Sequence, residues 1–285
     1  MTSPTLRHQM TRMAGYDTST YGERIAEVYD ANRSTPQNAE AAASFLADLA
    51  GKRRALELGI GTGRIAFPLA ARGIRVSGID SSEKMVAQLR AKPGGDAIPV
   101  TIGDFADVKA AGQFSLIYVV FNTFFMLLTQ EAQLRCFARA AKRLADGGVF
   151  VLEGFVPDTS LYDRGSNIRL KSVETDRVFL HVSRGGGASQ QSIGGDLEIS
   201  EAGIRFYPIQ VRYAWPSELD LMARLAGLRL RERWAGWNRE PFTDSSGAHV
   251  SVYEKRPDSM IVEPAAKNRA RRSKRTTSGP VNRGA

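Results

Sequence analysis

The sequence has a single cysteine, Cys136, among its 285 residues. One thiol excludes an internal disulfide framework and any multi-cysteine metal site, and we predict no metal ligands. No stretch approaches the roughly 20 consecutive apolar residues that span a bilayer, and the first residues lack the apolar run of a secretory signal. We therefore expect a protein of the reducing cytoplasm that does not enter a membrane.

Positive charge is in excess, but it is concentrated at one end. The formal net charge is +9, and residues 257–285 hold seven Lys and Arg against Asp258 and Glu263. This segment has almost no apolar content, so we predict a disordered basic tail. The remaining charge is too small to indicate a nucleic-acid partner by itself.

The body of the chain is rich enough in apolar residues, 42%, to form a substantial core. Apolar strands alternate with helical patterns at short spacing, which predicts a doubly wound, parallel α/β sheet. Thr35 is expected to cap the first clear helix, Pro68 to bend the helix after the glycines, and Gly147 and Gly148 to end a later helix. The expected helices cover 34–51, 64–73, 81–91 and 130–144, and the expected strands cover 54–58, 74–79, 98–102, 114–121 and 149–155.

After about residue 165 the pattern changes to β-rich segments separated by "GGGAS" and "GG" turns. This pattern indicates an antiparallel β insertion near the carboxyl edge of the sheet. A helix over 216–228 and strands over 228–234 and 249–253 would complete the main sheet. We thus expect five segments: a flexible 1–19, an α/β core over 20–165, the insertion over 166–215 as a substrate cover, closing elements over 216–256, and the tail 257–285.

The stretch "ALELGIGTGR" places a glycine-rich turn after the strand over 54–58. Its glycines are spaced Gly59-x-Gly61-x-Gly63, which lacks the third position of a dinucleotide fingerprint and the Gly-Lys-Ser/Thr of a P-loop. Glu57 would sit badly beside a pyrophosphate but would suit an ammonium group. The turn therefore points away from dinucleotides.

Two more acids follow the next two strands. Asp80 can accept both hydroxyls of a ribose, and Asp104 can accept a hydrogen bond from an adenine amino group, with Phe105 beside it. In an open α/β sheet these strand ends share one ligand-binding edge. An amine, a ribose and an adenine in this order are the groups of S-adenosylmethionine.

With "ELGIGTG", "GIDSSEKM" and "GDF" in this order, the sequence resembles the class I S-adenosylmethionine-dependent methyltransferases over about residues 20–256. The resemblance implies a Rossmann-like, seven-stranded, mostly parallel sheet. "FNTFFML", the late insertion and "LMARLAGLRLRERWAGWNREPF" are similar to the amino-sugar N-methyltransferases and peptide N-terminus methyltransferases. The donor-binding residues that it implies are Tyr21, Arg33, Glu57, Gly59, Gly61, Gly63, Asp80, Ser81, Met85, Asp104, Phe105 and Phe121.

Methyl transfer from a sulfonium needs the acceptor atom close to the methyl and in line with it. The candidates at the reacting centre are Tyr21, as a lid over the donor, and Asn122, after the fourth strand. Tyr21 could equally pack with Tyr29 on a helix, and Asn122 could cap the next helix. Arg33 could take the donor's carboxylate.

Relatives of this kind use a histidine as general base, and no histidine of this sequence aligns with it. A base is needed only when the acceptor arrives protonated. Glu153, at the end of the fifth strand, is either a base or a buried structural acid. His181 lies in the insertion and could reach substrate, whereas His249 is expected to be packed and His8 lies in the flexible start. Trp234 and Trp237 either line the pocket or pack in the core, where we also expect Cys136.

The function predicted from the sequence is methyl transfer from S-adenosylmethionine to an amine or hydroxyl of a small molecule, a secondary metabolite or sugar. A homodimer is allowed. Two alternatives stay open. One is a nucleic-acid methyltransferase that uses the tail, although "NTFF" lacks the prolines typical of exocyclic-amine enzymes and Cys136 is misplaced for cytosine C5 chemistry. The other is a donor-binding partner protein without catalysis.

Overall fold

The computed structural model describes residues 12–33, 36–51, 53–158, 160 and 166–256. Met1–Lys255 is one compact unit, and Arg256–Ala285 is a second, of which only Arg256 is described. Thr35, His8 and the predicted basic tail lie outside the described residues. Among the described residues, no helix combines the length and the apolar character needed to cross a membrane.

The main sheet, sheet A, has seven strands in the order β10-β11-β5-β4-β1-β2-β3. β11 is antiparallel to both of its neighbours, and the other paired strands are parallel. The prediction of a doubly wound, mostly parallel sheet is confirmed. The strand order reverses between β1 and β4, which is where such sheets bind ligands. The strands are β1 (Arg54–Leu58), β2 (Arg75–Asp80), β3 (Val100–Ile102), β4 (Phe114–Val119), β5 (Leu144–Phe155), β10 (Leu228–Trp234) and β11 (Ala248–Lys255).

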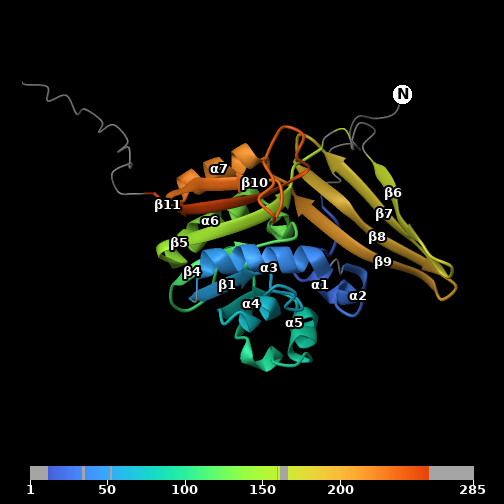
Figure 1. Ribbon diagram of the computed structural model, residues 1–285. Helices are drawn as coiled ribbons and strands as arrows, with labels where there is room; N and C mark the ends of the chain where they lie inside the picture. The colour runs from blue at the N-terminus through green and yellow to red at the C-terminus, as the bar shows by residue number, and fades with distance from the viewer. Residues whose placement is uncertain (1–11, 34–35, 52, 159, 161–165, 257–285) are drawn as a thin grey trace, which may run out of the picture. The chain divides into compact units, whose positions relative to one another are not determined.

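Helices cover both faces of sheet A (Figure 1). One core cluster joins α3 and α4 to one face of the sheet, and a second joins α6 and α7 to the other face. Every residue of β4 is buried, as expected of a strand covered on both sides. The helices are α1 (Thr20–Ile25), α2 (Tyr29–Arg33), α3 (Pro36–Ala50), α4 (Ala66–Ala71), α5 (Glu83–Arg90), α6 (Gln130–Arg143) and α7 (Pro216–Leu225).

Some predicted details of these elements were wrong. Pro68 is the third residue of α4, so its missing N–H falls in the first turn, where it causes no break. β5 begins at Leu144, directly after α6, so Gly147 and Gly148 lie inside the strand rather than at the helix end.

The insertion between β5 and α7 forms a separate antiparallel sheet, sheet B, in the order β6-β7-β8-β9. The predicted insertion is confirmed, but Gly194 and Gly195 were wrongly predicted as a turn. They lie in the middle of β8 and pair with both neighbouring strands. The strands are β6 (Asn167–Val173), β7 (Arg177–Gly186), β8 (Gln191–Ser200) and β9 (Gly203–Arg212).

The start of the described chain packs against sheet B. The backbone N–H of Met13 donates to Oε1 of Gln210 at 3.1 Å, and Tyr16 is buried. The expectation of a flexible segment over 1–19 therefore does not describe residues 12–19. These contacts lead the chain into α1, which contacts both β9 and α5.

Candidate active site

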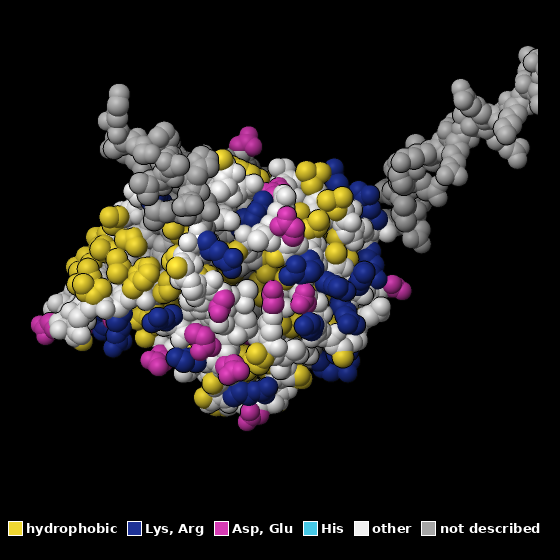
Figure 2. Space-filling view, turned by 180° about the vertical axis from the view of Figure 1, so that it is seen from behind, with side chains coloured by type: hydrophobic (Ala, Val, Ile, Leu, Met, Phe, Trp, Pro, Cys, Tyr) yellow, Lys and Arg dark blue, Asp and Glu magenta, His cyan; other side chains and the backbone are white. Residues whose placement is uncertain are grey.

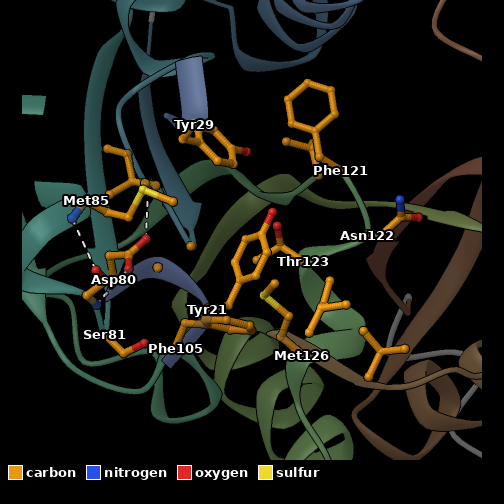
Figure 3. Close-up of a pocket in the computed structure, with 18 of the residues that line it drawn as sticks. Tyr21, Tyr29, Asp80, Ser81, Met85, Phe105, Phe121, Asn122, Thr123 and Met126 are labelled. Atoms are coloured by element: carbon orange, nitrogen blue, oxygen red, sulfur yellow. Dashed lines mark hydrogen bonds between the residues drawn. The ribbon is translucent and has the colours of Figure 1, made fainter. Parts of the chain in front are cut away.

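A cavity of about 520 Å³ lies at the carboxyl ends of β1, β2, β4 and β5 (Figure 3). The side of the cavity opposite these strand ends comes from α1 and from the inner face of sheet B. Its volume is typical of a small-molecule site. Of the predicted donor-binding and reacting-centre residues, ten line it together: Tyr21, Glu57, Gly59, Gly61, Asp80, Ser81, Met85, Phe105, Phe121 and Asn122.

Three predicted donor residues are not found in its lining. Gly63 faces Phe67, so this glycine serves the close packing of α4 behind the turn. Asp104 caps a short 3-10 helix by accepting the N–H of Ala106 at 2.8 Å, and its carboxylate lies 3.7 Å from Arg135. Arg33 ends α2, but its side chain lies outside what the structure describes.

The glycine turn after β1 is shaped by left-handed backbone. Gly59 has φ +74° and Gly61 has φ +53°, conformations that favour glycine. A Cβ on Gly59 would collide with Thr123, whereas a Cβ on Gly61 would meet nothing within 4 Å. Gly61 therefore presents open backbone to the cavity.

Asp80, at the end of β2, fixes this turn. Its carboxylate accepts the N–H of Gly61 at 2.7 Å and the N–H of Ser82 at 2.9 Å. Burial raises the pKa of Asp80, and the backbone hydrogen bonds oppose that rise. A carboxylate offers about four lone-pair sites, so Asp80 can still accept a hydroxyl group from a ligand beside these backbone N–H groups.

Glu57 lies at the bottom of the cavity and is 3% exposed. The Tyr118 hydroxyl donates to its carboxylate at 2.9 Å. Burial raises the pKa of Glu57 to about 8, and the Tyr118 hydrogen bond and the positive charge of Arg64 only partly oppose this. A cation in the cavity would favour the ionised carboxylate.

The turn after β4 is held by side chains from β5 and from the turn itself. Phe121 and Asn122 have φ +57° and +64°, so β4 ends at Val119, earlier than predicted. Glu153 accepts the backbone N–H of both residues, with an especially close contact to Phe121. Burial is the largest influence on Glu153 and raises its pKa to about 7.

Asn122 ties the turn back to β5. Its Oδ1 accepts the N–H of Phe155 at 2.7 Å, and its side chain makes no capping hydrogen bond to the short helix that follows. The alternative of a capping asparagine was wrong. Asn122 and Glu153 instead form a reciprocal clamp that fixes the wall of the cavity.

Tyr21 reaches from α1 into the cavity, as Figure 3 shows. It also packs against the small cluster of Ile25, Ala26, Met85 and Tyr207. Ser81 donates to the carbonyl of Thr18 at 2.8 Å and so joins the start of the chain to the end of β2. These contacts position the segment that covers the donor side of the cavity.

The remaining candidates separate clearly. His181 lines the cavity from β7. His249 is fully buried beside Ser251, and burial lowers its pKa to about 3. Trp234 and Trp237 are not found in the cavity lining and pack against the α3 side of the core, and Cys136 is buried in the core.

Sequence reasoning missed Arg64 as a site residue. It lines the cavity, its guanidinium carbon lies 3.6 Å from the centre of the Phe121 ring, and its charge acts on both Glu57 and Glu153. Its position directly after the third glycine was a usable signal. Thr123, Met126, Ser192 and Ile209 also line the cavity without any comparable signal.

Comparison with known proteins gives a consistent result. Residues 55–148 match the family model of a methyltransferase domain. The cypemycin N-terminal methyltransferase of Streptomyces sp. is 28% identical over 245 residues, which cover 84% of this chain and 99% of that protein. The solved structure of the CcbJ methyltransferase from Streptomyces caelestis has a TM-score of 0.81 and 40% identity, over 85% of this chain and all of that one. The sugar N-methyltransferase KedS8 from Streptoalloteichus sp. ATCC 53650 has a TM-score of 0.61 at 21% identity, over 85% and 98% of the two chains.

Proposed function

The chain belongs to the S-adenosylmethionine-dependent methyltransferases, and from this premise we propose that it methylates an amine or hydroxyl of a small molecule or short peptide of secondary metabolism. The observation that carries the acceptor class is that sheet B and the glycine turn line one cavity. An acceptor held by sheet B meets the donor in a site of small-molecule size. Relatives named for a peptide N-terminus and for a sugar amine support the same class.

The cavity fits the donor in three respects. Gly61 leaves open space where backbone can approach a ligand, and Asp80 keeps lone pairs for the ribose hydroxyls. Glu57 is a buried acid whose raised pKa a ligand ammonium would reverse. We assign the adenine side to Phe105 and Met85, because the Asp104 carboxylate is turned toward Ala106 and Arg135.

Arg64 is our candidate for the donor's carboxylate, with Arg33 as the second candidate. The Arg64 side chain lines the cavity beside Glu57, so a ligand that carries both an ammonium and a carboxylate finds partners of both signs. Arg64 is held over the Phe121 ring, which limits its rotamers. Because the Asn122–Glu153 clamp fixes Phe121, it also positions Arg64.

The bound donor supplies an activated methyl group, so the protein's task is to position the acceptor and remove its proton. Tyr21 covers the cavity from α1 and Asn122 holds the opposite wall. Sheet B acts as the substrate cover. Placing the acceptor atom in line with the methyl can lower the barrier by several kcal/mol in such a site.

The homodimer is supported by the outer face of sheet B. Figure 2 shows hydrophobic side chains gathered over this part of the molecule. Contiguous exposed apolar surface of this kind marks an interaction site, and a face with few charges is complementary to its own copy in a two-fold interface. The dimer would dissociate on substitution of Ile204 by Lys, as sedimentation velocity can measure. The exposed apolar residues of this face are Ile168, Leu170, Val173, Ile199, Ile204 and Phe206.

The first experiment is calorimetric titration of S-adenosylmethionine into the wild type, Asp80→Ala and the control Asp96→Ala, whose side chain is 91% exposed. We expect Asp80→Ala to weaken binding by about 100-fold, because two charge-assisted hydrogen bonds are lost. Asp96→Ala should bind as the wild type does. Asp80→Asn, which keeps one acceptor oxygen, separates loss of binding from loss of the turn.

The wild type is then incubated with donor and a panel of amino sugars, short peptides with free N-termini and hydroxylated glycosides. A mass gain of about 14 daltons on one of them supports the proposal. Donor binding without any product, on this panel and on DNA and RNA, would favour the non-catalytic alternative. Methylation of nucleic acid that is lost on deletion of residues 257–285 would favour the nucleic-acid enzyme.

A further inference from the structure

The inner face of sheet B carries an aspartate–histidine pair that the donor site does not use. Nδ1 of His181 on β7 lies 2.8 Å from Oδ1 of Asp196 on β8, and the two residues are directly opposite in the strand pairing. Lys171 donates to Oδ2 of the same carboxylate at 3.0 Å. Asp196 is 7% exposed, so its carboxylate is largely shielded from solvent.

We propose that His181, oriented by Asp196, is the general base that takes the proton from the methyl acceptor. This inference rests on the proposed function, since it needs an amine or hydroxyl acceptor in the cavity. His181 lines that cavity together with its strand neighbour Ser183 and with Ser192 on β8. Of the two histidines that the structure describes, His181 is the one at the site, because His249 is buried in β11.

The hydrogen bond to Asp196 fixes the tautomer of the ring. An ionised carboxylate can only accept, and Lys171 favours the ionised form, so Nδ1 carries the proton. Nε2 is then the nitrogen with the lone pair. A base whose orientation and tautomer are set by a second carboxylate is the arrangement that proton abstraction requires.

The step balances without any further reactant. The ammonium or hydroxyl of the acceptor gives its proton to Nε2 of His181, which becomes an imidazolium stabilised by Asp196. The freed lone pair forms the bond to the methyl carbon, and the carbon–sulfur bond breaks with its electron pair on sulfur. The imidazolium then returns its proton to solvent through the exposed 29% of the His181 side chain.

Charged and titratable groups face His181 from both sides of the cavity. The neighbouring strands of sheet B contribute Arg169, Lys171, Asp196, Glu198 and Tyr207. The strand ends, α1 and α2 contribute the titratable and charged groups that line the opposite wall, namely Tyr21, Tyr29, Glu57, Arg64, Asp80 and Glu153. Of these, Asp196 is the group whose carboxylate is in direct contact with the ring.

The kinetic test compares the wild type, His181→Gln and the control Glu201→Gln, using the panel acceptor that the wild type turns over fastest. Glu201 is an exposed residue in the turn between β8 and β9 and is not found in the cavity lining. We expect His181→Gln to lower kcat/KM about 100-fold at pH 7. The deficit should shrink to less than tenfold above the acceptor's own pKa, where bulk water has already removed the proton. A purely structural role would lower the rate by the same factor at every pH. A His181→Gln rate within threefold of the wild type at pH 7 would overturn the proposal.

A second readout needs no acceptor and therefore separates this inference from the proposed function. The chain has only three histidines, so nitrogen-15 histidine spectra can be assigned with the His181→Gln variant. In the neutral ring of the wild type we expect Nδ1 to carry the proton and Nε2 to carry the lone pair. Asp196→Asn should abolish this preference and reduce kcat/KM by about tenfold. An Nε2-protonated neutral ring in the wild type would contradict the assignment, whereas the absence of any methylated product would contradict the proposed function instead.

Discussion

The Tyr118 hydroxyl donates a 2.9 Å hydrogen bond to the carboxylate of Glu57 beneath the glycine turn. Tyr118 and Glu57 are directly paired residues of β4 and β1, the two strands at which the sheet order reverses. A buried acid therefore lies at the ligand-binding edge, where the neutral hydroxyl of Tyr118 donates to it. Glu57 is thus prepared to receive a cation.

Donor binding should release a proton through Glu57. With a pKa of about 8, Glu57 is mostly protonated at pH 7, and a bound ammonium favours its ionised form. We expect between one half and one proton to be released per donor at pH 7, and the affinity to rise with pH between 6 and 7.5. Calorimetry in phosphate and in Tris, which differ in ionisation enthalpy, measures this number.

Glu57→Gln should release no proton through this position, and its affinity should be lower by about 10- to 100-fold and flat over the same pH range. Tyr118→Phe removes the hydrogen bond that lowers the Glu57 pKa, so proton release should move closer to one. Unchanged proton release in Glu57→Gln would show that another group is responsible.

Asn122 should stabilise the protein both through its side chain and through its backbone conformation. Asn122→Ala leaves the Phe155 N–H without its partner, which costs about 1–3 kcal/mol. Alanine also tolerates φ +64° less well than asparagine. Asn122→Gly loses the same hydrogen bond, but glycine adopts this left-handed conformation without strain. It should therefore be more stable than Asn122→Ala by about 1 kcal/mol.

Urea denaturation of the wild type and both Asn122 variants measures these differences. The same variants should bind the donor more weakly, because Phe121 and the guanidinium above it would lose their fixed position. If Asn122→Ala unfolds at the same urea concentration as the wild type, the clamp between β4 and β5 does not stabilise the fold.

Gly194 should be required for the pairing of β7 with β8. A Cβ at this position would lie 2.0 Å from the carbonyl oxygen of Val182 and 2.7 Å from Cα of Ser183, which are backbone atoms that cannot rotate away. We expect Gly194→Ala to destabilise the protein by about 1–3 kcal/mol or more. Hydrogen exchange should show faster opening of sheet B than of sheet A.

Gly187→Ala is the matched control, since a Cβ at Gly187 would meet no atom within 4 Å. This variant should be neutral or slightly stabilising. Equal losses from both substitutions would show that the close strand contact at Gly194 is not the cause of the destabilisation. Equal protection of sheet B in Gly194→Ala and the wild type would contradict the predicted separation of the strands.

The sequence alone determined the class of fold and the edge of the sheet that binds the ligand. Apolar strands of five or six residues that alternate with amphipathic helices leave few topologies, and the expected bounds of β1 and β10 match the structure. Glu57 stands two residues before the first glycine of the turn, and Asp80 stands at the end of the next strand. In a parallel sheet these positions lie at the same ligand-binding edge. The fold class and the binding edge can be predicted from hydrophobic periodicity and motif spacing, because both depend on residues that are close together in the chain.

Only the tertiary structure decided which side chains share the cavity. The pairing register placed His181 opposite Asp196, and no local pattern announces a contact between two strands of an insertion. The Asp104 side chain accepts the N–H of Ala106 and therefore points away from the cavity. The Arg64 guanidinium stacks on the Phe121 ring, which places it in the cavity wall. Gly194 looked like a turn because composition cannot distinguish a flexible glycine from one required by a close backbone approach. Such contacts depend on residues far apart in the chain, and their geometry exists only once the sheets are assembled.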